Sequence, residues 1–207
     1  MKNRQEFEFD ESLCLRHGGL KLTLKGVELA GFTKKDKILD IGCGRGLSVK
    51  FLSSLGYNIQ GLDQNCDFPL IKGDARELPF KENELQGLLY ECSFSKMDQA
   101  EGVLKEAFRV LKPNGKIMIT DFYARGVKKE FSGLLGRVER KEEIDELFSR
   151  AGFTLVYWQD ESEGLAQTFG QLIFYHGSAA KIVGSNREDL KAAKAGYYQA
   201  IWEKNHA

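Results

Sequence analysis

Net charge is the first property that this sequence lacks. Its 207 residues include 30 lysine and arginine side chains and 30 aspartate and glutamate side chains, which cancel. A neutral chain without a block of basic residues lacks the electrostatic footprint of a protein that binds long nucleic acids. We therefore expect no nucleic-acid partner, and only a small structured RNA stays compatible with this composition.

Long apolar runs are also missing. No run reaches the length of a membrane-spanning helix, and the first residues, Met-Lys-Asn-Arg-Gln-Glu-Phe-Glu, contain no apolar signal-peptide centre. The sequence has neither internal repeats nor a low-complexity linker. We therefore expect a soluble, cytoplasmic protein that does not bind a membrane and that folds as a single domain over residues 1–207.

Cysteine and histidine are too sparse to indicate a metal centre. No Cys-x-x-Cys pair occurs, and no histidine lies at metal-ligand spacing from another ligand residue. We expect no metal site and four free thiols in a reducing compartment. Cys92, at the end of an expected strand, is either a small buried hydrophobe or a residue at the ligand-binding edge. The residues concerned are Cys14, Cys43, Cys66 and Cys92, with His17, His176 and His206.

Residues 38–46, Ile-Leu-Asp-Ile-Gly-Cys-Gly-Arg-Gly, are the most informative segment that the chain contains. The apolar run at 38–41 is typical of a strand buried in a parallel sheet. The three glycines then make a turn with almost no side-chain bulk, and residues 47–55 have the periodicity of a helix that ends at Gly56. Such a unit lets the backbone approach a ligand and directs helix N–H groups toward it. A tight turn without a ligand is the alternative.

The spacing of the glycines distinguishes two kinds of cofactor. Dinucleotide-binding turns place their third glycine three positions after the second, which allows the helix to pack closely on the strand. That position is Leu47 in this sequence, and the third glycine comes one residue early, at Gly46. The spacing therefore disfavours an NAD-binding oxidoreductase.

Further strands and turns follow at regular intervals. The pattern predicts strands over 57–62, 85–92, 116–122, 153–159 and 197–202. Asp63 ends the first of these, at a place where a carboxylate can accept both hydroxyls of a ribose. Asp98 is expected to open a helix, with Glu101 completing a capping box. Residues 112–115, Lys-Pro-Asn-Gly, should end that helix in a turn.

Several pieces in this order resemble one family. Asp40-x-Gly-x-Gly-x-Gly46 resembles motif I of the class I S-adenosylmethionine (SAM) methyltransferases, and the element Gly73-Asp74-Ala75 is similar to the one that caps their third strand. Residues 106–122 resemble the stretch after motif III in the quinone-biosynthesis, or type 11, methyltransferases. The resemblance covers roughly residues 15–155. It implies a Rossmann-like α/β fold, with a seven-stranded, mostly parallel sheet, an antiparallel last strand and helices on both faces.

The resemblance also implies a cofactor, SAM, with S-adenosylhomocysteine (SAH) as its product. In that family the glycine turn wraps the methionine end of SAM, and the aspartate of the Gly-Asp-Ala element meets the adenine amino group. Carried onto this chain, the cofactor-binding residues are Arg16, Asp40, Gly42, Cys43, Gly44, Gly46, Asp63, Gln64, Asp74, Ala75 and Glu91.

The activity that follows is methyl transfer to a small-molecule acceptor. The protein must align the acceptor and exclude water, and a base is needed only when the acceptor is protonated. No residue identifies itself as that base, and the candidates are Glu91, Cys92, Tyr123 and His17. Two alternatives stay open. One is an arsenite methyltransferase, because Cys92 matches a cysteine of that group, although no cysteine follows it. The other is a non-catalytic protein that binds SAM or SAH.

Three regions depart from the family pattern. Asp63 and Asp74 are eleven positions apart, which leaves little room for the usual helix between the second and third strands. Residues 1–30 are expected to be a lid and helix, with Leu20, Leu24 and Val27 on one face, Gly18-Gly19 as a hinge and Arg16 reaching the cofactor; a solvated helix cap is the alternative. Residues 161–195 are expected to be a helical insertion. Its amphipathic part, 164–176, would roof the acceptor site or form an oligomer surface through 161–180.

Overall fold

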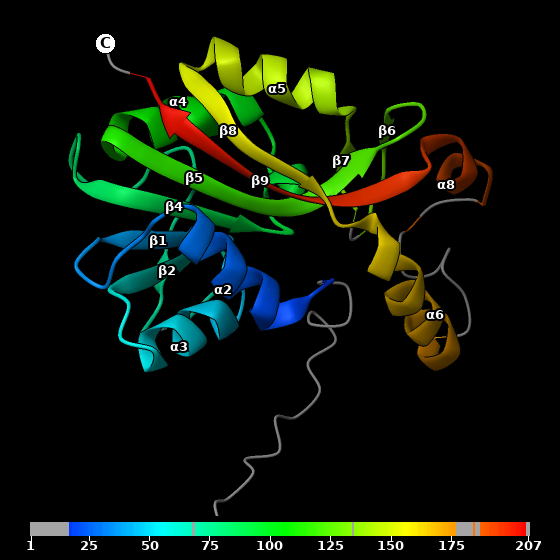
Figure 1. The fold of residues 1–207 in the computed structure, drawn as a ribbon, viewed down its shortest axis with the longest axis horizontal. Coiled ribbons are helices and arrows are strands. Elements are labelled where there is room, and N and C mark those ends of the chain that lie inside the picture. Colours follow the sequence, from blue (N-terminus) through cyan, green and yellow to red (C-terminus); the bar gives the residue numbers. More distant parts are fainter. Residues whose placement is uncertain (1–16, 68, 134, 177–183, 185–186, 206–207) are drawn as a thin grey trace, which may run out of the picture.

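One sheet runs through the computed structural model, which describes residues 17–67, 69–133, 135–176, 184 and 187–205 (Figure 1). Its seven strands lie in the order β3-β2-β1-β4-β5-β9-β8. The first five in this order are parallel, and β9 is antiparallel to both of its neighbours. The predicted fold class is therefore confirmed. The strands are β1 (Ile38–Ile41), β2 (Ile59–Asp63), β3 (Ile71–Lys72), β4 (Leu85–Glu91), β5 (Leu111–Ala124), β8 (Phe153–Asp160) and β9 (Ala195–Lys204).

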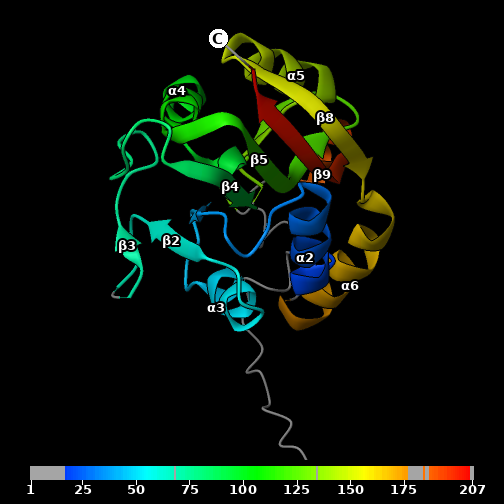
Figure 2. The same ribbon diagram turned by 60° about the vertical axis from the view of Figure 1, so that its left-hand side comes forward.

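Helices cover both faces of this sheet (Figures 1 and 2). Helices α2 (Gly19–Leu29) and α3 (Leu47–Ser54) lie on one face, and α4 (Ala100–Val110) and α5 (Lys141–Arg150) on the other. The short ribbon of β6 (Lys129–Glu130) and β7 (Arg137–Val138) follows β5. Between β8 and β9 come η2 (Ser162–Gly164), α6 (Leu165–His176) and α8 (Arg187–Ala193), at one end of the sheet. The remaining element, η1 (Phe94–Lys96), follows β4.

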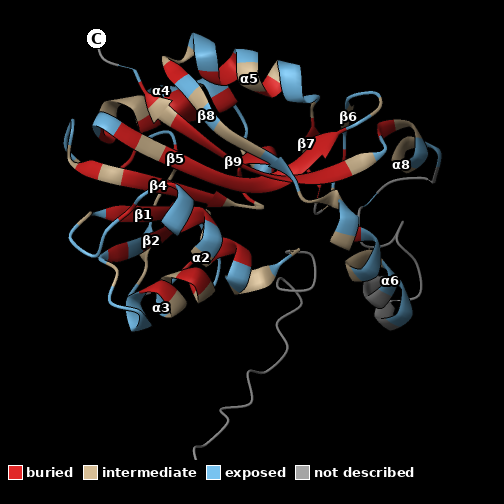
Figure 3. Ribbon diagram, viewed as in Figure 1, coloured by how far each residue is buried: buried red, intermediate tan, exposed pale blue. Residues whose placement is uncertain are grey.

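The central strands are buried on both sides, which explains their continuous apolar sequences (Figure 3). Leu88 and Leu89 are neighbours in β4, yet Leu88 packs in the cluster under α4 and α5 and Leu89 in the cluster under α2 and α3. Phe148 of α5 stacks on Trp202 of β9 at 4.1 Å between ring centroids. No helix in the described part of the chain combines the length and the apolar character needed to cross a membrane.

Helix α2 buries Leu22, Thr23, Gly26 and Val27, and Leu24 packs on the same cluster as Val27, whereas Leu20 is half-buried. One expectation about a helix is wrong. Helix α4 has no capping box at Asp98, because Gln99 occupies the N-cap in a left-handed conformation and makes no side-chain cap. The short connection between β2 and β3 is as the spacing indicated. Residues 64–67 and 69–70, which the structure describes there, contain no helix.

Candidate cofactor and acceptor site

The glycine turn is held in a conformation that side chains rarely adopt. Gly42, Gly44 and Gly46 have φ angles of 73°, 52° and 71°. A Cβ atom on Gly42 would lie 2.5 Å from Cβ of Ser93, whereas a Cβ on Gly44 would have nothing within 4 Å. The backbone N–H of Gly42 donates to the carbonyl of Leu62 at 2.8 Å, which fixes the turn against β2. Gly44 therefore lines open space with bare backbone, where a ligand can approach closely.

Asp63 faces this turn from the neighbouring strand. Its Oδ2 accepts the N–H of Gly44 at 2.9 Å, and its Oδ1 accepts the N–H of Asn65 at 2.9 Å. A carboxylate can accept about four hydrogen bonds, so each oxygen keeps capacity for another donor. Since β1 and β2 are parallel and paired from Ile38–Ile59 to Ile41–Leu62, their ends bring these residues together. The arrangement suits a ligand with two adjacent hydroxyl groups.

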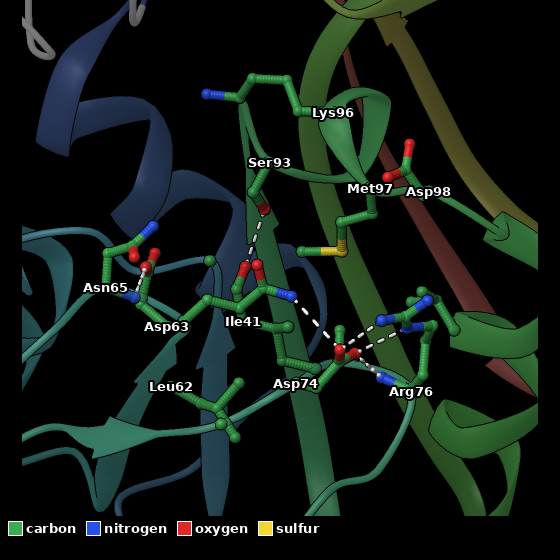
Figure 4. A pocket seen from close by; sticks show the side chains of 15 residues that line it. Ile41, Leu62, Asp63, Asn65, Asp74, Arg76, Ser93, Lys96, Met97 and Asp98 are labelled. Atoms are coloured by element: carbon green, nitrogen blue, oxygen red, sulfur yellow. Dashed lines mark hydrogen bonds and ion pairs between the residues drawn. The ribbon is translucent and has the colours of Figure 1, made fainter.

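A cavity of about 240 Å³ extends from Asp63 across the ends of β1, β2 and β3 (Figure 4). Its far wall comes from the segment after β4, where the hydroxyl of Ser93 donates to the carbonyl of Ile41 at 2.7 Å. Asp63, Gln64, Asp74, Ala75 and Gly42 were expected here from sequence. The lining residues that the sequence did not indicate are Asn65, Arg76, Ser93, Lys96, Met97, Asp98 and Val103, with Ile41, Leu62 and Gly73.

Asp74 is already occupied by protein donors. Arg76 reaches both of its oxygens, with Nε at 2.9 Å and an Nη atom at 2.6 Å, and the N–H of Arg76 and the side chain of Gln64 add two more bonds. These bonds from Arg76 hold the pKa of Asp74 at about 2. All four acceptor positions of the carboxylate are used. A ligand amino group would have to compete with Arg76 or Gln64 for Asp74.

Glu91, at the end of β4, lies outside this cavity and joins the two helices on that face. Its two oxygens accept hydroxyls from Thr23 of α2 and Ser48 of α3, both at 2.6 Å. Sequence reasoning missed Thr23 and Ser48. Each is a polar residue on the inner face of an expected helix. A search for apolar periodicity does not detect such residues.

The other turn residues contribute backbone and packing. Burial, with Asp40 and Asp63 nearby, raises the pKa of the Cys43 thiol to about 12, so this sulfur stays protonated. Asp40 is buried in β1. Gly46 is the N-cap of α3, where a Cβ would lie 3.0 Å from the side chain of Leu70.

The structure connects two of the four base candidates. The Cys92 sulfur lies 3.1 Å from the hydroxyl of Tyr197, and the Tyr197 ring meets the His17 ring edge-on at 5.9 Å between centroids. Cys92 itself has a φ of 53°, which turns the chain at the end of β4. Tyr197 was not a candidate from sequence. Arg16 and the rest of the expected lid, residues 1–16, lie outside the described residues.

Tyr123 is placed apart from this group. Its ring packs against Trp158 and Tyr198, at 5.4 and 5.8 Å between centroids, in the cluster under α4 and α5. Burial and a hydrogen bond to Asp160 raise the pKa of Tyr123 to about 12. Its surroundings are those of a core residue. Among the residues that the structure describes, no group of three or more histidine, cysteine, aspartate or glutamate side chains is placed to hold a metal ion.

Comparisons with known proteins agree with this geometry. Residues 39–119 match the family described as a methyltransferase domain. A demethylmenaquinone methyltransferase of Tropheryma whipplei (strain Twist) is 27% identical over 111 residues, which cover 46% of this chain and 45% of that protein. The chain therefore spans about half the length of the curated relatives that it matches.

Solved structures extend the likeness to nearly the whole chain. The cyclase SpnF has a TM-score of 0.73 at 22% identity, over 97% of this chain and 86% of that one. The Burkholderia thailandensis 1,6-didemethyltoxoflavin N1-methyltransferase, solved with 1,6-didemethyltoxoflavin and SAH, has a TM-score of 0.66 at 18% identity, over 95% and 80%. At these identities the likeness shows a shared fold. Residues 39–119 are similar to the methyltransferase-domain family, and the chain as a whole has the fold of a class I SAM-dependent methyltransferase.

Proposed function

We propose that this chain is a SAM-dependent methyltransferase that acts on a small-molecule acceptor. The observation that carries the proposal is the hydrogen bond from Gly44 to Asp63, which lines the same cavity as Asp74. The glycine backbone, the Asp63 carboxylate with spare acceptor capacity and the recess follow one another in the order in which the methionine, ribose and adenine parts of SAM are joined. The family match over residues 39–119 supports the same cofactor.

Each part of the cofactor has residues that suit its chemistry. Asp63 accepts the ribose hydroxyls, and the turn from Gly42 to Gly46 accommodates the methionine part. Met97 and Ala75 give the recess an apolar surface for the adenine ring. Glu91 contributes negative charge near the methionine ammonium group, held in position by the hydroxyls of Thr23 and Ser48. Opposite charge at this point favours a cationic ligand group over a neutral one.

The protein's part in the reaction is alignment and exclusion of water. Bound SAM supplies a methyl group on a positively charged sulfur. The sulfur leaves as a neutral thioether, so no acid has to protonate it. Correct orientation of two reactants can lower a barrier by roughly 7–11 kcal/mol at the extreme. An acceptor that has to lose a proton would pass it to the side chains that meet beyond β4, namely Cys92, Tyr197 and His17. Tyr123, in the core, takes no part.

The arsenite alternative gains no support from the described residues. Cys92 contacts the Tyr197 hydroxyl, and Cys43 and Cys66 belong to the turn and loop on the cofactor side of the sheet. Cys14, the remaining cysteine, lies outside the described residues. Trivalent arsenic binds best to several thiolates together. Quinone-type acceptors, as in the relative from Tropheryma whipplei, fit the proposal better than a metalloid.

Two titrations and one turnover assay test the proposal. Calorimetry should show SAH binding to the folded protein and no binding of NADH. Transfer of the radiolabelled methyl group from SAM to a panel of quinols and phenols should then be measured. A folded protein that fails to bind SAH, or that prefers NADH, would contradict the cofactor assignment. SAH binding without transfer to any acceptor in a broad panel would favour the non-catalytic alternative.

A further inference from the structure

A second cleft lies at the end of the sheet, away from the cofactor cavity. It has a volume of about 570 Å³, which is in the range of small-molecule sites. Three apolar residues and three basic residues line it, from the segment after β5, from α6, from α8 and from the start of β9. They are Phe169, Leu190 and Ala195, with Arg125, Lys191 and Lys194. The cleft is therefore apolar inside and positively charged at its rim.

Hydrogen bonds to the backbone hold the rim of the cleft in place. The N–H of Gly126 donates to the carbonyl of Ala193 at 2.9 Å, and the N–H of Val127 donates to that of Ala192 at 3.0 Å. A Cβ on Gly126 would lie 2.2 Å from the Ala192 oxygen, so only glycine permits this approach. Arg125 in turn donates to the carbonyl of Lys194, whose φ of 46° is unusual for a lysine. These bonds fix Arg125 and Lys194 beside each other, despite their like charge.

The positive charge of the rim is not neutralised within the described part of the chain. No described carboxylate lies within ion-pair distance of Arg125, Lys191 or Lys194. The acidic residues near the rim form other interactions or are exposed to solvent. Asp189 pairs with Lys129 at 2.8 Å. Asp160 accepts the N–H of Ser162 at 2.8 Å and interacts with the charge of Arg125 only at longer range. Glu188 is exposed on α8. Three like charges held around an apolar floor favour an anionic ligand.

The apolar residues of the cleft pack on a buried cluster that extends to Cys92. Phe169 meets Phe122 at 6.5 Å between ring centroids, and Phe122 meets Tyr197 at 5.2 Å. Tyr197 touches Cys92, and all four residues belong to one apolar cluster at the carboxyl end of β4 and β5. Leu190 and Ala195 of the cleft pack on the same cluster.

We propose that this cleft holds the anchoring end of the methyl acceptor, and that the acceptor is an amphipathic molecule with an apolar body and an anionic group. The proposal rests on the proposed function for its link to methyl transfer. The anionic group pairs with Lys191, Lys194 and Arg125, and the apolar body lies against Phe169, Leu190 and Ala195. A neutral or cationic molecule of the same shape would leave the three positive charges without a partner.

Binding of decanoate, decanol and decyltrimethylammonium tests the charge preference at fixed chain length. Each is titrated calorimetrically as a monomer into the full chain. We expect decanoate to bind about tenfold more tightly than either of the others. Lys191→Glu, which reverses one rim charge on an exposed side chain, should weaken decanoate binding about tenfold. Lys105→Glu makes the same charge change at an exposed position of α4 and should alter decanoate binding less than about twofold.

Three results would overturn the proposal. They are no decanoate binding to the unmodified protein, equal binding of the cationic probe, and unchanged decanoate binding in Lys191→Glu. Binding to phosphatidylglycerol vesicles without binding of monomeric decanoate would also overturn it, because the cleft would then contact a membrane surface. SAH is titrated into the same samples. If SAH fails to bind while decanoate binds selectively, the proposed function fails and the anion site stands.

Discussion

On the cofactor side of the site, Gly44 and Asp63 meet because two neighbouring parallel strands end at the same edge. On the acceptor side, Cys92 and His17 are connected through Tyr197, which comes from the last strand, more than a hundred residues after Cys92. The first arrangement is set by residues at or next to strand ends. The second depends on how distant segments pack together. Relatives that share a methyl donor but differ in acceptor would keep the residues at the strand ends and vary the contacts between distant segments.

The comparison predicts that the two sides respond to substitution separately. Changes on the cofactor side should reduce SAH binding in proportion to the contact that is lost. Changes on the acceptor side should leave SAH binding intact and alter only transfer. The predictions below run from the largest expected effect to the smallest.

Gly44→Val should abolish measurable SAH binding. Valine at a φ of 52° strains the turn, and its side chain fills the open space in which the methionine part is expected. Gly31→Val is the matched control, because Gly31 also has a positive φ, 74°, and nothing within 4 Å of an added Cβ, but its N–H donates to the carbonyl of Glu28 and not to Asp63. Both variants should lose similar stability in thermal denaturation, and only Gly44→Val should lose SAH. Retained binding in Gly44→Val would place the cofactor elsewhere.

Asp63→Ala should weaken SAH binding tenfold to a hundredfold. Two ribose hydroxyls would lose their acceptor, at a cost of about 1.5–3 kcal/mol. Asp36→Ala is a suitable control, because Asp36 also accepts a backbone N–H, that of Thr33 at 2.7 Å, in an exposed turn before β1, at the opposite end of that strand from the cavity. Calorimetry on both folded variants gives the comparison. Equal affinity in the two variants would remove the ribose assignment.

Arg76→Ala should strengthen SAH binding about threefold. The substitution frees two acceptor positions on Asp74, and a hydrogen bond from the adenine amino group to a free position contributes about 0.5–1.5 kcal/mol. Arg109→Ala is the control, since Arg109 makes the same kind of two-bond pair with Glu106 outside the cavity. Weaker binding in Arg76→Ala would show that the guanidinium itself contacts the adenine ring.

Cys92→Ser should leave SAH affinity within about twofold of the unmodified protein, because the side chain faces Tyr197 and lies outside the cofactor cavity. Transfer to the acceptor is the quantity that should change. A large loss of SAH affinity in this variant would remove the separation between the two sides. Arsenite methylation by the unmodified protein, lost in Cys92→Ser, would restore the metalloid alternative.

Local sequence was enough to predict the sheet and the glycine turn. The apolar runs indicated the principal strands because β1, β4 and β5 are buried on both faces, and the glycines marked a turn that other residues rarely make. The short β2–β3 connection followed from the spacing of Asp63 and Asp74. Each of these features is determined by a few consecutive residues.

Long-range packing explains what the sequence did not show. Gly26 of α2 is buried by a close approach, in which an added Cβ would lie 2.6 Å from Gln199 and 2.8 Å from Met118. Thr23 is buried because its hydroxyl meets Glu91 in a strand 68 residues away. Arg76 and Met97 enter the cavity from loops whose course depends on the finished sheet. None of these contacts leaves a periodic pattern in its own segment.

A crystal structure of the SAH complex tests the central claim most directly, namely that a nucleoside cofactor lies across the ends of β1 and β2. We expect the ribose hydroxyls to contact the Asp63 carboxylate, the methionine part to lie on the backbone of Gly42–Gly46, and the adenine ring to enter the recess beside Met97. SAH bound with its ribose away from Asp63, or bound in the cleft beside Lys191, would contradict the account.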